Sequence, residues 1–378
     1  MTTASPTDIR IPASLLPEDG RFGCGPSKVR PASVEALAAA GRSTLGTSHR
    51  QAPVKSLVRR VRDGITSLLG LPDGYQVVLG NGGATAFWDV ATFALVMERG
   101  QHLSFGEFSA RFAAAAAAAP HLGDPEVIES PPGTHPTPRG SEGVDCYAYT
   151  HNETSTGVMM SELRRPDGAE PGALVLVDAT SGAGGLRYDP ADVDAYYFAP
   201  QKCFGSDGGL WVAVLSPAAL ERAGRLVKER WVPASLDLGI AIEQSALDQT
   251  YNTPAVATLL LFVDQLDWIN NAGGIDFSAG RCERSAATMY GWAEASDYAS
   301  PYVAKPDERS NVVATIDLDP AIEGTAVAAV LRANGVVDTE PYRKLGRNQL
   351  RVGMFPSIEP ADVEALTRCI DHVVSALS

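Results

Sequence analysis

Two short apolar runs, each followed closely by an ionisable residue, constrain the fold of this chain more than any other feature. Residues 174–177 end at Asp178, and residues 196–199 lead to Lys202. Short apolar runs bounded by loops are typical of buried strands, and open α/β sheets bind ligands at the carboxyl ends of their strands. We therefore expect Asp178 and Lys202 at that edge of a sheet. The alternative is that Lys202 is an ordinary solvated loop lysine.

The composition indicates a globular enzyme rather than a nucleic-acid or membrane-surface protein. The 378 residues are enough for two domains, and 45 acidic against 31 basic residues give a net charge of −14. A basic footprint for nucleic acid or anionic lipid is therefore missing. The five cysteines form no CxxC pair, so we expect neither disulfides nor a metal site. With no signal peptide or membrane-spanning stretch in the sequence, we expect a cytoplasmic protein.

The pattern of apolar residues predicts an α/β fold with a largely parallel central sheet. We expect helices at 54–69 (ended by Gly70), 84–96, 113–119 and 256–269, and strands at 77–79, 147–149, 174–177, 196–199 and 209–215. Beyond a break at 270–274, strands at 312–316 and 349–354 and helices at 325–333 and 363–377 indicate a smaller α+β domain. The predicted division is an N-terminal segment 1–20, whose order the sequence leaves open, a large domain 21–270 and a small domain 271–378.

A glycine turn at residues 80–83 lies between a predicted strand and a predicted helix. The free backbone N–H groups at such a helix N-terminus suit a phosphate. The alternative is that the glycines serve only the bend of the chain.

Several short motifs, in order along the chain, carry a resemblance to a known family. They are Gly25-Pro26, residues 47–50, residues 152–154, Asp178, Gln201-Lys202, residues 252–254 and Leu350-Arg351. From about residue 21 to its end, the chain resembles the fold-type I, pyridoxal phosphate-dependent aminotransferases of class V. Within class V it is similar to the phosphoserine aminotransferases in their actinobacterial form.

The resemblance implies a role for most of these residues. Lys202 would form a Schiff base with pyridoxal phosphate and act as the general base, and Asp178 would pair with the pyridine nitrogen. The implied cofactor contacts are the backbone of Ala84 and Thr85, and the side chains of Thr154, Thr180, Gln201, Asn252 and Thr253, with Phe108 stacking on the ring.

Two of these assignments have open alternatives. Phe108 stands where the family often has tryptophan, and it could equally be a core residue of the alanine-rich helix. Asn252 and Thr253 would reach the cofactor of a neighbouring subunit in a homodimer with shared active sites. The other interpretation makes Thr253 the N-cap of a helix that has Pro254 as its first residue, and both can hold at once because a helix N-terminus is also an anion site.

The cationic residues would select the substrate. The resemblance assigns Arg351 to the α-carboxylate, and His49 and Arg50, supplied across the dimer, to a phosphate ester. Three further cations, Arg343, Lys344 and Arg347, could join that pocket or be solvated. The family often has an arginine at the position of Thr85, so here the phosphate pocket must be completed differently or hold the phosphate with fewer charges.

The function implied is phosphoserine:2-oxoglutarate aminotransferase, acting by a ping-pong mechanism in serine biosynthesis, with a further expected role in pyridoxine biosynthesis. Its substrates would be phosphoserine, glutamate, 2-oxoglutarate and 3-phosphohydroxypyruvate. The nearest alternative is an alanine–glyoxylate or serine–pyruvate aminotransferase of class V, which would not need His49 and Arg50. A cysteine desulfurase lacks support, because Cys203 adjoins the lysine rather than lying on a distant loop. A non-catalytic metabolite-binding protein has no reason to retain Lys202 and Asp178.

Overall fold

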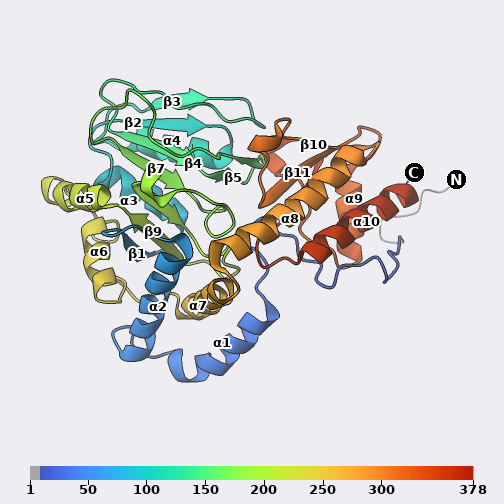
Figure 1. Ribbon diagram of the computed structural model, residues 1–378, viewed down its shortest axis with the longest axis horizontal. Helices are drawn as coiled ribbons and strands as arrows, with labels where there is room; N and C mark the ends of the chain where they lie inside the picture. Colours follow the sequence, from blue (N-terminus) through green and yellow to red (C-terminus); the bar gives the residue numbers. More distant parts are fainter. Residues whose placement is uncertain (1–8, 378) are drawn as a thin grey trace.

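A seven-stranded sheet organises the larger part of the molecule (Figure 1), of which the computed structural model describes residues 9–377. Its strands are β1 (Gln76–Asn81), β2 (Gly100–Ser104), β3 (Glu126–Glu129), β4 (Cys146–Thr150), β7 (Leu174–Asp178), β8 (Ala195–Phe198) and β9 (Leu210–Leu215). They lie in the order β1-β9-β8-β7-β4-β2-β3, and β9 runs antiparallel to both of its neighbours. The other pairs are parallel, which confirms the predicted α/β class and mostly parallel sheet.

Helices cover both faces of this sheet. They are α1 (Pro31–Thr44), α2 (Ala52–Leu69), α3 (Ala84–Ala94), α4 (Glu107–Ala118), α5 (Pro217–Glu229), α6 (Leu238–Ala246) and α7 (Val256–Asn271). Along β7, Val175 and Val177 join the core under α2 and α7, whereas Leu174 and Leu176 join the core under α3 to α6. A strand buried on both faces needs a continuous apolar run, which is the pattern seen in the sequence.

The predicted helices agree closely with the observed ones. The seven apolar positions predicted for α2 are all buried, and Gly70 ends the helix in the left-handed conformation, with φ of 58°. The helix predicted at 113–119 is the second half of α4, which begins earlier, at Glu107, and ends at Ala118 with Ala119 as its C-cap. The helix predicted at 84–96 ends at Ala94, two residues early.

The C-terminal part is a small α+β unit, as predicted. It contains α8 (Gly274–Ala295), α9 (Gly324–Ala333), α10 (Pro360–Leu377) and an antiparallel sheet of β10 (Ala299–Pro301), β11 (Val313–Leu318) and β12 (Gln349–Gly353). The start of the described chain packs here too, because Ile9, Ile11 and Phe22 share its hydrophobic core. In Figure 1, α8 extends from the large part along this small sheet. The domain boundary at 270/271 stays a prediction.

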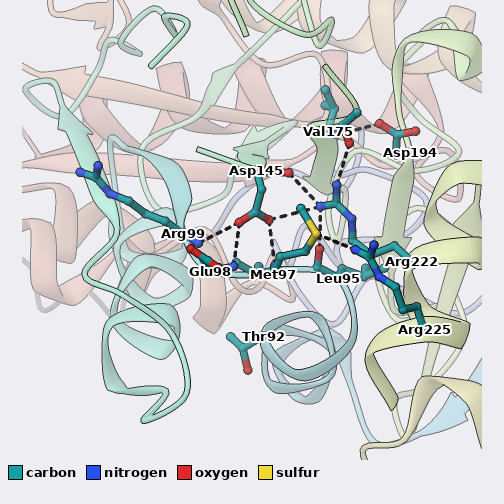
Figure 2. A network of polar contacts seen from close by, with 12 residues as sticks. Thr92, Leu95, Met97, Glu98, Arg99, Asp145, Val175, Asp194, Arg222 and Arg225 are labelled. Carbon is teal, nitrogen blue, oxygen red and sulfur yellow. Dashed lines mark hydrogen bonds and ion pairs between the residues drawn. The ribbon is translucent and has the colours of Figure 1, made fainter. Parts of the chain in front are cut away.

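A buried ion pair ties together the edge of the large sheet opposite to Asp178 (Figure 2). The Asp145 carboxylate accepts the backbone N–H groups of residues 97–99 at 2.8–2.9 Å. Arg222, on α5, donates to the Asp145 carboxylate at 3.2 Å and to the carbonyl oxygens of Leu95 and Gly172 at 3.0 and 2.6 Å. These contacts join the ends of α3, β2, β4 and α5, and so hold these elements together at the edge of the sheet away from Asp178. None of the described helices is long and apolar enough to cross a membrane.

Candidate active site

A cavity of about 330 Å³ lies at the carboxyl ends of β4 and β7 and beside the loop after β8. The residues that line it are Gly25, Pro26, Gly83, Ala84, Thr85, Trp88, Phe108, Thr150, Asn152, Thr154, Asp178, Thr180, Ser181, Gln201 and Lys202. All predicted cofactor residues except Asn252 and Thr253 are among them. The parallel strands therefore bring together residues that are more than a hundred positions apart in the sequence.

Lys202 is partly buried at the base of this cavity. Its ammonium nitrogen donates to the carbonyl oxygen of Cys24 at 2.7 Å. Burial lowers the pKa of Lys202 to about 8, and the positive charge of Arg351 acts in the same direction. A lysine with this pKa has a substantial neutral fraction near neutral pH, as a general base requires.

Because Gly25 has no side chain, the Lys202 side chain can lie directly against its backbone. Its φ is +141°, a conformation that residues with a side chain rarely adopt, and a Cβ atom there would lie 1.9 Å from the Lys202 Nζ. A glycine at position 25 is thus a steric requirement of the lysine position.

Asp178 ends β7 as a buried carboxylate held by three hydrogen bonds. Its Oδ1 accepts the backbone N–H of Thr180 at 2.9 Å and the Thr180 hydroxyl at 2.5 Å, and its Oδ2 accepts the Trp88 indole N–H at 2.8 Å. Burial raises the pKa of Asp178, and these hydrogen bonds lower it. The Thr180 hydroxyl, predicted to contact the cofactor, here donates to Asp178.

The N-terminus of α3 forms one wall of the cavity. The helix begins at Ala84, and the N-cap Gly83 supplies no side-chain hydrogen bond. The first N–H groups of a helix have no intrahelical partner and carry a partial positive charge. This end of α3 can therefore receive an anion through the backbone of Ala84 and Thr85.

Glu153 fixes the start of α4, from which Phe108 faces the cavity. Its fully buried carboxylate accepts the N–H groups of Phe108 and Ser109 at 3.1 and 2.9 Å, and the Ser155 hydroxyl at 2.7 Å. Phe108 lines the cavity and also packs against the core beneath α3, so it has core contacts, and its stacking on the cofactor stays a prediction. Beside it, the Thr154 hydroxyl donates to Ser181 at 2.8 Å.

Arg351 approaches the cavity from β12 of the small unit. Its guanidinium donates to the Thr154 carbonyl oxygen at 3.2 Å and lies 5.1 Å above the centre of the Tyr342 ring. The Arg351 Nε is buried and has no partner among the described residues. Among the neighbouring cations, Lys344 pairs with Glu107 and Arg347 with Asp317.

The remaining predicted residues gather on the surface, outside the cavity lining. The His49 Nδ1 and the Thr253 hydroxyl are 3.1 Å apart, and Arg50 donates to Gln249 at 2.6 Å. Arg50, Asn252 and Thr253 are exposed. The interpretation of Thr253 as an N-cap is wrong: α7 begins only at Val256, residues 253–255 have no regular secondary structure, and Ala255 takes the cap position.

The cavity fits pyridoxal phosphate in several independent ways. It offers a lysine amine, a buried carboxylate for a ring N–H, the aromatic side chains of Trp88 and Phe108, and a helix N-terminus for a phosphate. It also contains buried oxygens without partners among the described residues, the Asn152 Oδ1 and the Gln201 Oε1. Such atoms require a hydrogen-bond donor from a ligand or water.

Comparison with known proteins decides the family. The model of the aminotransferase class-V family matches residues 26–339. The chain belongs to the class-V aminotransferases. It is accordingly an enzyme that uses pyridoxal phosphate.

Relatives and solved structures narrow this further. A phosphoserine aminotransferase of a Nocardioides species is 62% identical over 98% of this chain and 99% of its own, and that of Rhodococcus opacus is 58% identical over 97% and 98%. The crystal structure of a phosphoserine aminotransferase from Cytophaga hutchinsonii matches with a TM-score of 0.85 at 22% identity, covering 93% of this chain and 99% of that one. An alanine–glyoxylate aminotransferase from a Nostoc species matches with 0.77 at 20%, covering 99% and 100%. The class-V fold alone therefore does not distinguish substrates.

Sequence reasoning missed three residues of this class-V site. Trp88, Glu153 and Ser181 each hydrogen-bond a predicted residue or position its backbone. No sequence signal marks Trp88 or Ser181, because a tryptophan in an apolar helix and a loop serine are both ordinary. Glu153 did have a sequence signal, because it lies within residues 152–154, one of the motifs that carry the family resemblance.

Proposed function

We propose that this chain is a phosphoserine aminotransferase, which exchanges an amino group between L-glutamate and 3-phosphohydroxypyruvate to give 2-oxoglutarate and 3-phospho-L-serine. The observation that carries the proposal is full-length identity of 62% to a relative of that name. The cavity supports it, because lysine, carboxylate and helix N-terminus lie together there. The reaction belongs to serine biosynthesis.

Each of the main residues of the cavity has its own role in the proposed reaction. Bound pyridoxal phosphate supplies an aldehyde carbon for the amine and a ring that accepts electrons. Neutral Lys202 takes the proton from the substrate Cα, and its pKa of about 8 makes that form accessible. Asp178 would supply the negative charge that pairs with the ring nitrogen. The N–H groups of Ala84 and Thr85 would hold the cofactor phosphate, with a contact from the Gln201 side chain.

Arg351 binds the α-carboxylate of both amino acids. Its planar fork can form two parallel hydrogen bonds to a carboxylate. Its unpartnered, buried Nε supports this role, since a ligand carboxylate would satisfy it.

We infer that two subunits share their active sites. His49, Arg50, Asn252 and Thr253 form one surface cluster, and none of them lines the cavity of their own chain. Large apolar side chains are exposed near it, including Tyr251 at 48% and Leu247 at 55%. A partner surface would cover these side chains and receive the cluster beside its own cavity.

In such a dimer, His49 and Arg50 bind the substrate phosphate and take the place of the arginine that the family often has at the position of Thr85. The same cations receive the side-chain carboxylate of glutamate, so one pocket serves both substrates in turn in a ping-pong cycle. We also propose a cytoplasmic location and activity on the related phosphorylated hydroxythreonine of pyridoxine biosynthesis.

The test is an absorbance titration of the purified, cofactor-loaded protein with single amino acids. Phosphoserine and glutamate should convert the cofactor band to that of the amine form, whereas serine and alanine should not. Conversion by alanine or serine alone would instead indicate the alanine–glyoxylate or serine–pyruvate activity.

Two arginine variants locate the phosphate pocket. Arg50→Ala should weaken the apparent binding of phosphoserine about tenfold or more, as loss of a charge-assisted contact does. Arg60→Ala is the matched control, because Arg60 lies on α2 and pairs with Asp267 on the surface. Equal behaviour of the two variants would remove Arg50 from the pocket.

A further inference from the structure

Trp88 lines the cavity, and its indole points a hydrogen-bond donor at a catalytic carboxylate. It lies one turn into α3, four residues after Ala84, so both side chains face the same way. The side chain is 5% exposed. Its Nε1 donates to the Asp178 Oδ2 at 2.8 Å, across 90 residues of sequence.

The Asp178 carboxylate has nearly all of its acceptor positions filled. A carboxylate offers about four lone-pair positions. Thr180 fills two at Oδ1 and Trp88 fills one at Oδ2. About one position is left, on the oxygen that Trp88 holds. A ring N–H can use only that position without displacing a protein donor.

We propose that Trp88 is a positioning residue, whose indole N–H keeps Asp178 charged and fixes the oxygen that faces the cofactor ring nitrogen. The proposal rests on binding of pyridoxal phosphate in this cavity. Burial disfavours the charged carboxylate, and the hydrogen bonds from Thr180 and Trp88 oppose that effect. Without the indole N–H, Asp178 takes up a proton more readily and pairs less well with a protonated ring.

The experiment replaces the indole by a ring without a donor. Trp88→Phe keeps an aromatic ring against Phe112, whose ring stacks on that of Trp88 at 6.1 Å between centroids. Trp292→Phe is the matched control, because the Trp292 Nε1 donates to Asp371 at 2.9 Å in the small unit, so it loses the same kind of bond elsewhere. The dissociation constant of pyridoxal phosphate is measured on the cofactor-free proteins at a series of pH values from mildly acidic to mildly alkaline, together with their melting temperatures.

We expect Trp88→Phe to bind pyridoxal phosphate about tenfold more weakly or worse, since a hydrogen bond to a charged group is lost. Relative to the wild type, the deficit should grow as the pH falls, because more of the variant's Asp178 is then protonated. Trp292→Phe should bind like the wild type.

A second comparison separates the hydrogen bond from packing. In an Asp178→Asn background, Trp88→Phe should add less than about a threefold further loss, because no charged acceptor remains there. Binding by Trp88→Phe within about twofold of the wild type at every pH would overturn the proposal, and so would an undiminished loss in the Asp178→Asn background. Failure of the wild type to bind pyridoxal phosphate would instead refute the proposed function.

Discussion

Replacing Gly25 by alanine tests whether the shape of the backbone beside Lys202 is needed for the reaction. The new Cβ would lie 1.9 Å from the Lys202 Nζ, 2.5 Å from its Cε and 2.9 Å from its Cδ. To reach ordinary contact at 3.4 Å, the nitrogen must move by about 1.5 Å. That movement breaks its 2.7 Å hydrogen bond to the Cys24 carbonyl oxygen.

Two effects of different size follow from Gly25→Ala. An alanine is strained at the φ of +141°, which should lower the free energy of unfolding by about 1–3 kcal/mol. Each kcal/mol lost lowers the Tm by ~2–4 °C. Misplacing a catalytic group by about 1 Å can cost ~100-fold in rate. We therefore expect a modest loss of stability and a loss of about two orders of magnitude in the half-reaction rate with phosphoserine.

The assay combines thermal melting, stopped-flow half-reactions, and borohydride trapping of the cofactor on Lys202 followed by peptide mass spectrometry. Gly143→Ala is the control, because Gly143 has φ of +73° and a Cβ there would meet nothing within 4 Å. The control should lose stability only. If Gly25→Ala retained trapping and a rate within about threefold of the wild type, the steric argument would be refuted.

Three further perturbations have defined outcomes. Burial lowers the pKa of Lys202 to about 8 from 10.5, so the charged ammonium lowers the free energy of unfolding of the cofactor-free protein. Lys202→Met should therefore raise the Tm at neutral pH, and this gain should shrink as the pH rises from 8 to 10.5. A gain in Tm that does not depend on pH would contradict this reasoning. Tyr342→Leu should raise the KM for glutamate about 3- to 10-fold by removing the ring beneath Arg351, while Tyr342→Phe should not. Asp145→Ala should lower the unfolding free energy by about 3–5 kcal/mol in denaturant titrations, because it leaves Arg222 buried and unpaired; a loss under about 1 kcal/mol would show that the network is not needed.

The fold could be predicted from the sequence wherever local pattern and burial agree. The run before Asp178 is apolar because β7 is buried on both faces, and α2 shows its buried stripe at helical spacing. The ends of elements were predicted less closely: the strand predicted at 312–316 is observed at Val313–Leu318, since its pairing continues to Asp317 with β12 and to Leu318 with β10.

The site was predictable only as far as its residues resemble known motifs. Lys202 and Asp178 are recognisable as charged residues that follow apolar runs. Trp88 is not, because a tryptophan in an apolar helix has the same pattern whether it fills a core or holds a carboxylate. Likewise, the pairing of His49 with Thr253 spans 204 residues, and no local pattern encodes it.

The hydrogen bond between Lys202 and the Cys24 carbonyl oxygen has a consequence for how the protein is made. The segment around Cys24 is held in turn by β12, because the Gly353 N–H donates to the Phe22 carbonyl oxygen at 2.8 Å. A nascent polypeptide therefore cannot complete the lysine's surroundings until β12 has left the ribosome. A translation product that stops before β12 should therefore lack a complete catalytic centre.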